Sequence, residues 1–126
     1  MLHNDKTALV VDDEPPDLEM LRKALADLGY RVIEAGGGEA ALEAFQAHPG
    51  VIDLLVTDVA MSPVNGCELA ADLLKLNPDL QVVFVSGYVG SEAFRYGRGL
   101  TGGFAFLRKP LRPAELEAEL RAAVMA

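Results

Sequence analysis

Residues 54–58 read Leu-Leu-Val-Thr-Asp, a short apolar run that ends in a carboxylate. The turn that follows, from Val59 to Gly66, contains Pro63 and Asn65, residue types that interrupt regular structure. A strand that is apolar on both sides is typical of a parallel sheet covered by helices on both faces. Its last residue then lies at the carboxyl edge of the sheet, where open α/β sheets bind ligands. Asp58 is therefore the first candidate for chemistry.

The rest of the chain alternates strand and helix patterns around this segment. Further strands are predicted at residues 7–11, 31–35, 81–85 and 104–107, and helices at 15–28, 39–47, 65–76 and from 113 onward. Five glycines between residues 89 and 103 each disfavour a helix by about 1 kcal/mol relative to alanine, so we expect a short or irregular fourth helix near Ser91–Tyr96. The alternation predicts an α/β fold of parallel βαβ units with right-handed crossovers.

Length and composition limit what this chain can be. Its 126 residues, 51% of them hydrophobic, suit a single domain over residues 1–126 with a substantial core. A net charge of −8 argues against direct binding of nucleic acid, which needs clustered basic residues. No apolar stretch approaches the ~20 residues of a membrane span, so we expect a cytoplasmic protein. The single cysteine, Cys67, cannot form an internal disulfide and is predicted to be a core thiol.

Polar side chains follow four of the predicted strands. Asp12 and Asp13, Asp58, Ser86 and Lys109 all come at strand ends, which meet at one edge of a parallel sheet. Three carboxylates brought together repel one another, so a cation is needed, and an all-oxygen site open to water suits Mg²⁺. Such a metal and a lysine form a charge clamp for a phosphoryl group. Asp58 would then be the nucleophile that forms an aspartyl phosphate.

Each of these residues has a plainer explanation when it is taken alone. An aspartate after a strand is commonly a turn former or a helix cap, as Asp58 would be. Asp12 and Asp13 would equally suit the negatively charged start of a helix. Lys109 before a proline is most often a solvated loop charge, and Ser86 before a glycine is most often part of a turn. Their joint appearance at the ends of four strands favours a site.

The sequence resembles the receiver domains of two-component response regulators over nearly its whole length. The resemblance rests on Val10–Pro15, on Asp53–Met61 followed by Gly66, on Val85–Tyr88 and on Phe106–Pro110. It implies a flavodoxin-like (βα)5 fold, with a five-stranded parallel sheet in the order 2-1-3-4-5.

The resemblance also implies a role for each residue of the acidic cluster. Asp58 matches the aspartate that is phosphorylated in this family. Asp13 would be a direct ligand of Mg²⁺, with Mn²⁺ as the alternative ion, and Asp12 would act through water. Ala60 would provide its backbone carbonyl to the metal.

Three other positions have implied roles, Lys109 as a catalytic residue, Phe106 in the switch, and Ser86 in both. Ser86 matches the hydroxyl residue that turns toward the phosphoryl group, Lys109 the lysine that pairs with it, and Phe106 the aromatic residue that changes rotamer. Phe106 lacks the hydroxyl of the more familiar tyrosine, so its switch would depend on packing. The family usually has proline where this chain has Ser62, with Pro63 one residue later. The glycine-rich stretch resembles receivers attached to hybrid sensor kinases or standing alone.

The resemblance therefore implies a phospho-accepting signalling domain rather than an enzyme, with chemistry limited to its own phosphotransfer and autodephosphorylation. Its phosphoryl donor would be a histidine kinase or a histidine phosphotransfer protein, and we expect a monomer or weak dimer. In this family the positions of Ala60 and Tyr88 flank the attacking water, so the resemblance, with a small Ala60 and a bulky Tyr88, implies a phosphorylated state that lasts minutes or longer. One alternative is a pseudo-receiver that binds partners without phosphorylation. The other is an aspartyl-phosphate phosphatase, although haloacid-dehalogenase-like enzymes have a second aspartate at the position of Ala60.

The first predicted helix also suggests a surface for the partner. Its leucines would face the sheet, and helical geometry leaves Pro16, Asp17, Met20, Lys23 and Ala24 facing away. Met20 is either a boundary residue folded back onto Ala24 or a contact for a four-helix bundle of a kinase or phosphotransfer protein.

Overall fold

A computed structural model of the chain describes residues 5–87 and 104–125. Its strands are β1 (Thr7–Val11), β2 (Arg31–Ala35), β3 (Ile52–Asp58), β4 (Gln81–Ser86) and β5 (Ala105–Arg108). All neighbouring strands pair in parallel, in the order β2-β1-β3-β4-β5. The flavodoxin-like topology predicted from the sequence is confirmed, while the expected helix near Ser91–Tyr96 lies outside the described residues.

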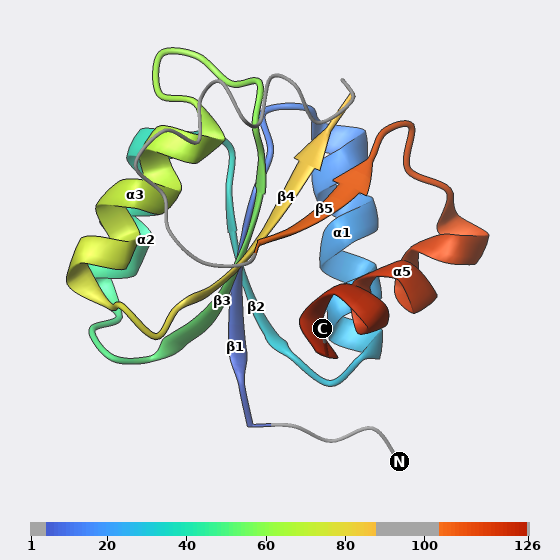
Figure 1. Cartoon of the computed structure of the whole chain (residues 1–126), viewed down its shortest axis with the longest axis horizontal. Coiled ribbons are helices and arrows are strands. Elements are labelled where there is room, and N and C mark those ends of the chain that lie inside the picture. Colours follow the sequence, from blue (N-terminus) through green and yellow to red (C-terminus); the bar gives the residue numbers. More distant parts are fainter. Residues whose placement is uncertain (1–4, 88–103, 126) are drawn as a thin grey trace.

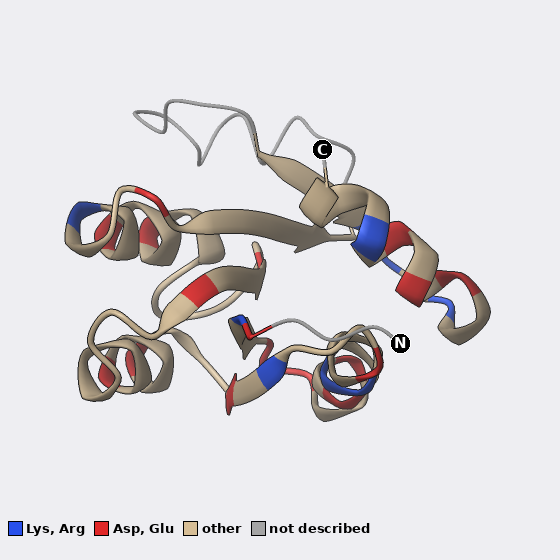
Figure 2. Ribbon diagram, turned by 90° about the horizontal axis from the view of Figure 1, so that it is seen from below, with Lys and Arg blue, Asp and Glu red and all other residues tan. Residues whose placement is uncertain are grey.

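Helices cover both faces of this sheet. They are α1 (Pro15–Asp27), α2 (Gly38–Ala47), α3 (Gly66–Leu76) and α5 (Pro113–Met125). In Figure 1, α2 and α3 lie together on one side of the sheet and α1 and α5 on the other. Figure 2 shows that charged residues lie mainly on the helices of both layers. No helix within the described ranges is long and apolar enough to span a membrane.

The core consists of two layers because the central strands point side chains to both faces. On β3, Leu55 packs in the α2–α3 layer, whereas Leu54 and Val56 pack in the α1–α5 layer. Every residue of β1 is buried as well. Cys67 is 1% exposed in the α2–α3 layer, which confirms the predicted core thiol.

Several element boundaries differ from the sequence prediction by one or two residues, and two of these differences have a visible cause. β3 begins at Ile52, two residues earlier than expected, because Asp53 does not interrupt the strand. The Asp53 carboxylate accepts a hydrogen bond from the Thr7 N–H at 3.0 Å. At the start of α3, Asn65 is the N-cap rather than the first helical residue. Its side chain accepts from the Glu68 N–H at 2.9 Å, which satisfies a donor that the helix leaves free.

The predicted outward face of α1 is wrong at Ala24, which is buried at 8% exposure. Helix α5 packs against α1 at this point, and a small side chain lets the two helices approach closely. Met20 is half-buried against the same layer, whereas Pro16 and Lys23 are exposed as expected. The α1–α5 contact was not visible in the sequence because it joins segments far apart in the chain.

Candidate functional site

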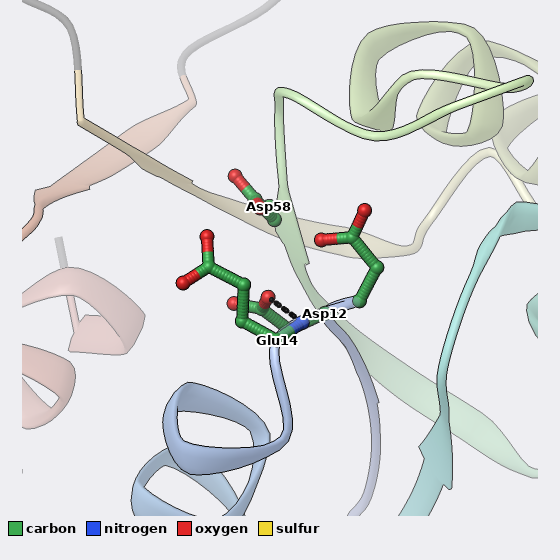
Figure 3. Close-up of side chains that lie close together, drawn as sticks. Asp12, Glu14 and Asp58 are labelled. Atoms are coloured by element: carbon green, nitrogen blue, oxygen red, sulfur yellow. Dashed lines mark hydrogen bonds between the residues drawn. The ribbon is translucent and has the colours of Figure 1, made fainter.

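The carboxyl edge of the sheet brings together the acidic residues that the sequence singled out. Carboxylate oxygens of Asp12, Asp13, Glu14 and Asp58 lie within 4.8 Å of one another. Figure 3 shows that the Asp12 and Glu14 side chains, from the loop after β1, lie close to Asp58 at the end of β3. Asp12 is 1% exposed and Asp58 is 3% exposed, whereas Asp13 and Glu14 are open to solvent. Glu14 was not predicted as a member, although its position beside two aspartates was a usable signal.

Backbone groups orient the two buried carboxylates. The Glu14 N–H donates to Asp12 Oδ1 at 2.9 Å, and the Ala60 N–H donates to Asp58 Oδ1 at 3.2 Å. Each bond spans two residues and turns the side chain back toward its own loop. Ala60 is exposed in the turn after β3, and the role of its carbonyl in metal binding stays a prediction.

The loop after β3 folds back tightly over Asp58. The Gly66 N–H donates to the Val59 carbonyl at 2.9 Å. A Cβ atom on Gly66 would lie 2.1 Å from the backbone oxygen of Asp58, so only glycine fits at this point. The start of α3 is thereby packed directly on the residue that ends β3.

Lys109 enters the cluster from the loop between β5 and α5. Its Nζ lies 3.0 Å from Asp17 Oδ2, 3.1 Å from Asp12 Oδ2 and 3.2 Å from Asp58 Oδ2, with Glu14 Oε1 at 3.6 Å. Its backbone N–H donates to the Ser86 carbonyl at 2.8 Å, which ties the loop to the end of β4. The side chain is 13% exposed.

Burial has the largest effect on the pKa values of the two buried aspartates. It raises the pKa of Asp12 to about 6, against the opposing effects of the Glu14 N–H and Lys109. Burial also raises the pKa of Asp58, and Lys109 opposes this shift. For Lys109, burial lowers the pKa, but contacts with Asp17 and Asp12 and the charge of Asp58 outweigh it, so the pKa rises. One ammonium group therefore pairs with four carboxylates. This excess of negative charge favours binding of a further cation.

The residues of this site fit a hard divalent cation. Asp12 Oδ2 is buried and accepts no hydrogen bond from the described residues, although it is paired in charge with Lys109. Such an oxygen can accept a hydrogen bond from a metal-bound water, or it can bind the metal directly. Four carboxylates with open access at Asp13 and Glu14 match the oxygen ligands and retained waters that Mg²⁺ prefers. The geometry thus supports one part of the Mg²⁺ prediction, namely that these carboxylates could act as metal ligands.

Mg²⁺ is expected to stabilise the fold because it relieves repulsion that exists only when the carboxylates are assembled. At about 100 times its dissociation constant it should add about 2.7 kcal/mol to the free energy of unfolding, and Asp13→Asn should weaken this response. Thermal melts with MgCl₂, compared with NaCl at equal ionic strength, measure the effect. A melting temperature that does not respond to high millimolar Mg²⁺ would contradict the metal assignment.

The two predicted switch residues lie on β4 and β5. Ser86 ends β4 and is 5% exposed. Phe106 is 49% exposed, and its ring stacks on Phe84 with centroids 5.4 Å apart. The ring of Phe104 packs edge-on against the Phe84 ring, with the two ring centroids 5.6 Å apart. Tyr88, predicted to cover the site, lies outside the described residues.

Comparison with known proteins agrees with this geometry. Residues 8–121 match the family model of the response regulator receiver domain. This chain belongs to the response regulator receiver domain family. It is 36% identical to the sensor kinase CckA of Brucella abortus (strain 2308), and the match covers 91% of this chain and 12% of CckA. It is also 35% identical to the response regulator GtcR of Aneurinibacillus migulanus, and this match covers 93% of this chain and 47% of GtcR.

Solved structures show the same fold. The chemotaxis protein CheY4 of Vibrio cholerae superposes with a TM-score of 0.78 at 25% identity, over 95% of this chain and 99% of that one. The receiver domain spans less than half the length of the two curated relatives. In those relatives it is therefore one part of a larger protein.

Proposed function

We propose that this receiver domain accepts a phosphoryl group on Asp58, with Mg²⁺, from a histidine kinase or a histidine phosphotransfer protein. The observation that carries the proposal is the position of Asp58 Oδ2, 3.2 Å from Lys109 Nζ. The same Nζ atom lies 3.1 Å from the buried Asp12 Oδ2, in the cluster of four carboxylates that could hold a metal. A carboxylate placed between a fixed cation and a metal-competent cluster is set up for phosphoryl transfer. The modified domain would then present a changed binding surface.

The chemistry follows from the groups in place. An oxygen of Asp58 attacks phosphorus, the bond from phosphorus to the donor's imidazole nitrogen breaks, and the nitrogen keeps the electron pair. Lys109 holds a positive charge against the oxygens that gain charge. Mg²⁺, when bound, neutralises further charge on the phosphoryl group. Water later cleaves the acyl phosphate, and no reaction on another substrate is proposed.

Labelling with acetyl phosphate tests this function. Wild-type protein incubated with acetyl phosphate and Mg²⁺ should gain one acid-stable, hydroxylamine-labile phosphoryl group, and Asp58→Asn should gain none. Asp53→Asn is a matched control, because Asp53 lies at the other end of the same strand. Equal labelling of Asp58→Asn and wild type, or no labelling of any protein, would refute the proposal.

The donor is proposed to dock on the groove between α1 and α5. Met20, Lys23, Ala24 and Asp27 of α1 line this groove, which has a volume of about 230 Å³, together with Pro113, Leu116 and Glu117 of α5. A half-buried methionine at such a position can repack against a partner helix.

Met20→Lys should therefore slow phosphotransfer from a histidine phosphotransfer protein about tenfold, while labelling by acetyl phosphate stays unchanged. Leu76→Lys is the control, because Leu76 is 56% exposed on α3 in the opposite layer. Rates of transfer from a labelled donor measure the effect. If the rates of phosphotransfer and of acetyl phosphate labelling fall together, Met20 is needed for the fold and not for docking.

A further inference from the structure

Asp17 makes the shortest of the four contacts of Lys109, at 3.0 Å, yet neither the sequence motifs nor the proposed phosphotransfer gives it a role at the site. It lies in the first turn of α1, and its side chain is 19% exposed. Pro15 and Pro16 occupy the first two positions of that helix and restrict its backbone. The backbone that carries Asp17 is therefore restricted, and its carboxylate reaches the site through the contact with Lys109.

The other three carboxylates that contact Lys109 belong to the metal-competent cluster. Asp12, Glu14 and Asp58 are members of that cluster, and Asp17 is not. A divalent cation bound there neutralises much of the charge that attracts Lys109 and also repels its ammonium group directly. Unless another carboxylate holds it, Lys109 would be displaced from the site when the metal enters. The proposed phosphotransfer uses both cations, because each stabilises negative charge on the transferred phosphoryl group.

We propose that Asp17 is a positioning residue that keeps Lys109 beside Asp58 when the metal is bound. The ammonium group has three donors, and one of them is engaged by a carboxylate that the cation does not use. Asp17 thus lets one lysine and one metal share a small acidic site. This inference rests on the proposed function, and it makes Asp17 part of the site and not only of the partner face.

The test is the accessibility of Lys109, measured by acetylation with an N-hydroxysuccinimide ester and peptide mass spectrometry, with and without saturating Mg²⁺. In wild type, Lys109 should stay protected in both conditions, while exposed Lys75 reacts in both. In Asp17→Asn, Lys109 should stay protected without metal and react about tenfold faster or more with Mg²⁺. Asp17→Glu, which keeps the charge, should behave like wild type. Asp72→Asn, at an exposed position on α3 in the opposite layer, is the control.

The outcomes separate this inference from the proposed function. If Lys109 stays protected in Asp17→Asn with Mg²⁺, the inference is wrong. If Lys109 of that variant reacts without metal, the inference is also wrong, because Asp17 then has a general role in folding. Reaction of wild-type Lys109 with Mg²⁺ overturns it as well. Labelling of Asp58 by acetyl phosphate in wild type is measured separately, so the proposed function can stand when this inference fails.

Discussion

Gly66→Ala is expected to destabilise this domain by about 3 kcal/mol and to disturb Asp58 at the same time. The added Cβ would lie 2.1 Å from the Asp58 carbonyl oxygen and 3.1 Å from the Val59 Cα atom. Both atoms belong to the backbone, so no side chain can rotate away to relieve the overlap. The start of α3 must move away from the end of β3, which breaks the close contact between them.

Urea unfolding monitored by circular dichroism measures this loss. Gly36→Ala is the matched control, because no atom lies within 4 Å of a Cβ placed there, and its free energy of unfolding should change little. Any folded Gly66→Ala protein should also be labelled more slowly by acetyl phosphate. Equal stability of the two alanine variants would contradict the packing described for this turn.

Lys109→Ala is expected to lower the free energy of unfolding by roughly 3–5 kcal/mol in the absence of metal, the usual cost of removing one partner of a buried ion pair. Lys109 is 13% exposed, and the side chains of Asp12 and Asp58 beside it are 0% and 4% exposed. Without the lysine these carboxylates face one another with no cation between them. Mg²⁺ should therefore stabilise the variant more than it stabilises wild type.

The pH dependence of this loss has a definite sign. Burial already raises the pKa of Asp12 to about 6, and losing Lys109 raises it further. The folded variant then binds more protons than the unfolded chain, so its stability rises as pH falls from 7 toward 5, and the gap to wild type narrows. Lys75→Ala, at an exposed position near the end of α3, is the control. A Lys109→Ala protein that matches this control at pH 7 would contradict the charge balance described here.

Most of the fold was predictable because its elements carry local signals. Buried runs marked the strands, and leucines at helical spacing marked the helices. Strand ends in parallel order placed Asp12, Asp58, Ser86 and Lys109 at one edge before any contact was known. The boundary at Asp53 was missed because a charged residue at the open end of a strand can be satisfied by a backbone N–H of its neighbour, which a single segment does not reveal.

The errors concern contacts between distant segments. Ala24 was expected to face solvent, but α5 covers it, and helix–helix packing depends on the tertiary arrangement. Asp17 was assigned to a partner face, although it lies 3.0 Å from Lys109. Nothing in the spacing of these two residues along the chain indicates that contact. Helical periodicity says which residues share a face, but not what that face meets.

The most direct test of the central claim is to locate the phosphoryl group. Borohydride reduces an aspartyl phosphate to homoserine, and peptide mass spectrometry then identifies the modified position. After treatment with acetyl phosphate and Mg²⁺, homoserine is expected at position 58, and omission of either reagent should abolish it. Homoserine at Asp12 or Asp13 instead, or its complete absence from a folded protein that binds Mg²⁺, would contradict the assignment of Asp58 as the phosphoacceptor.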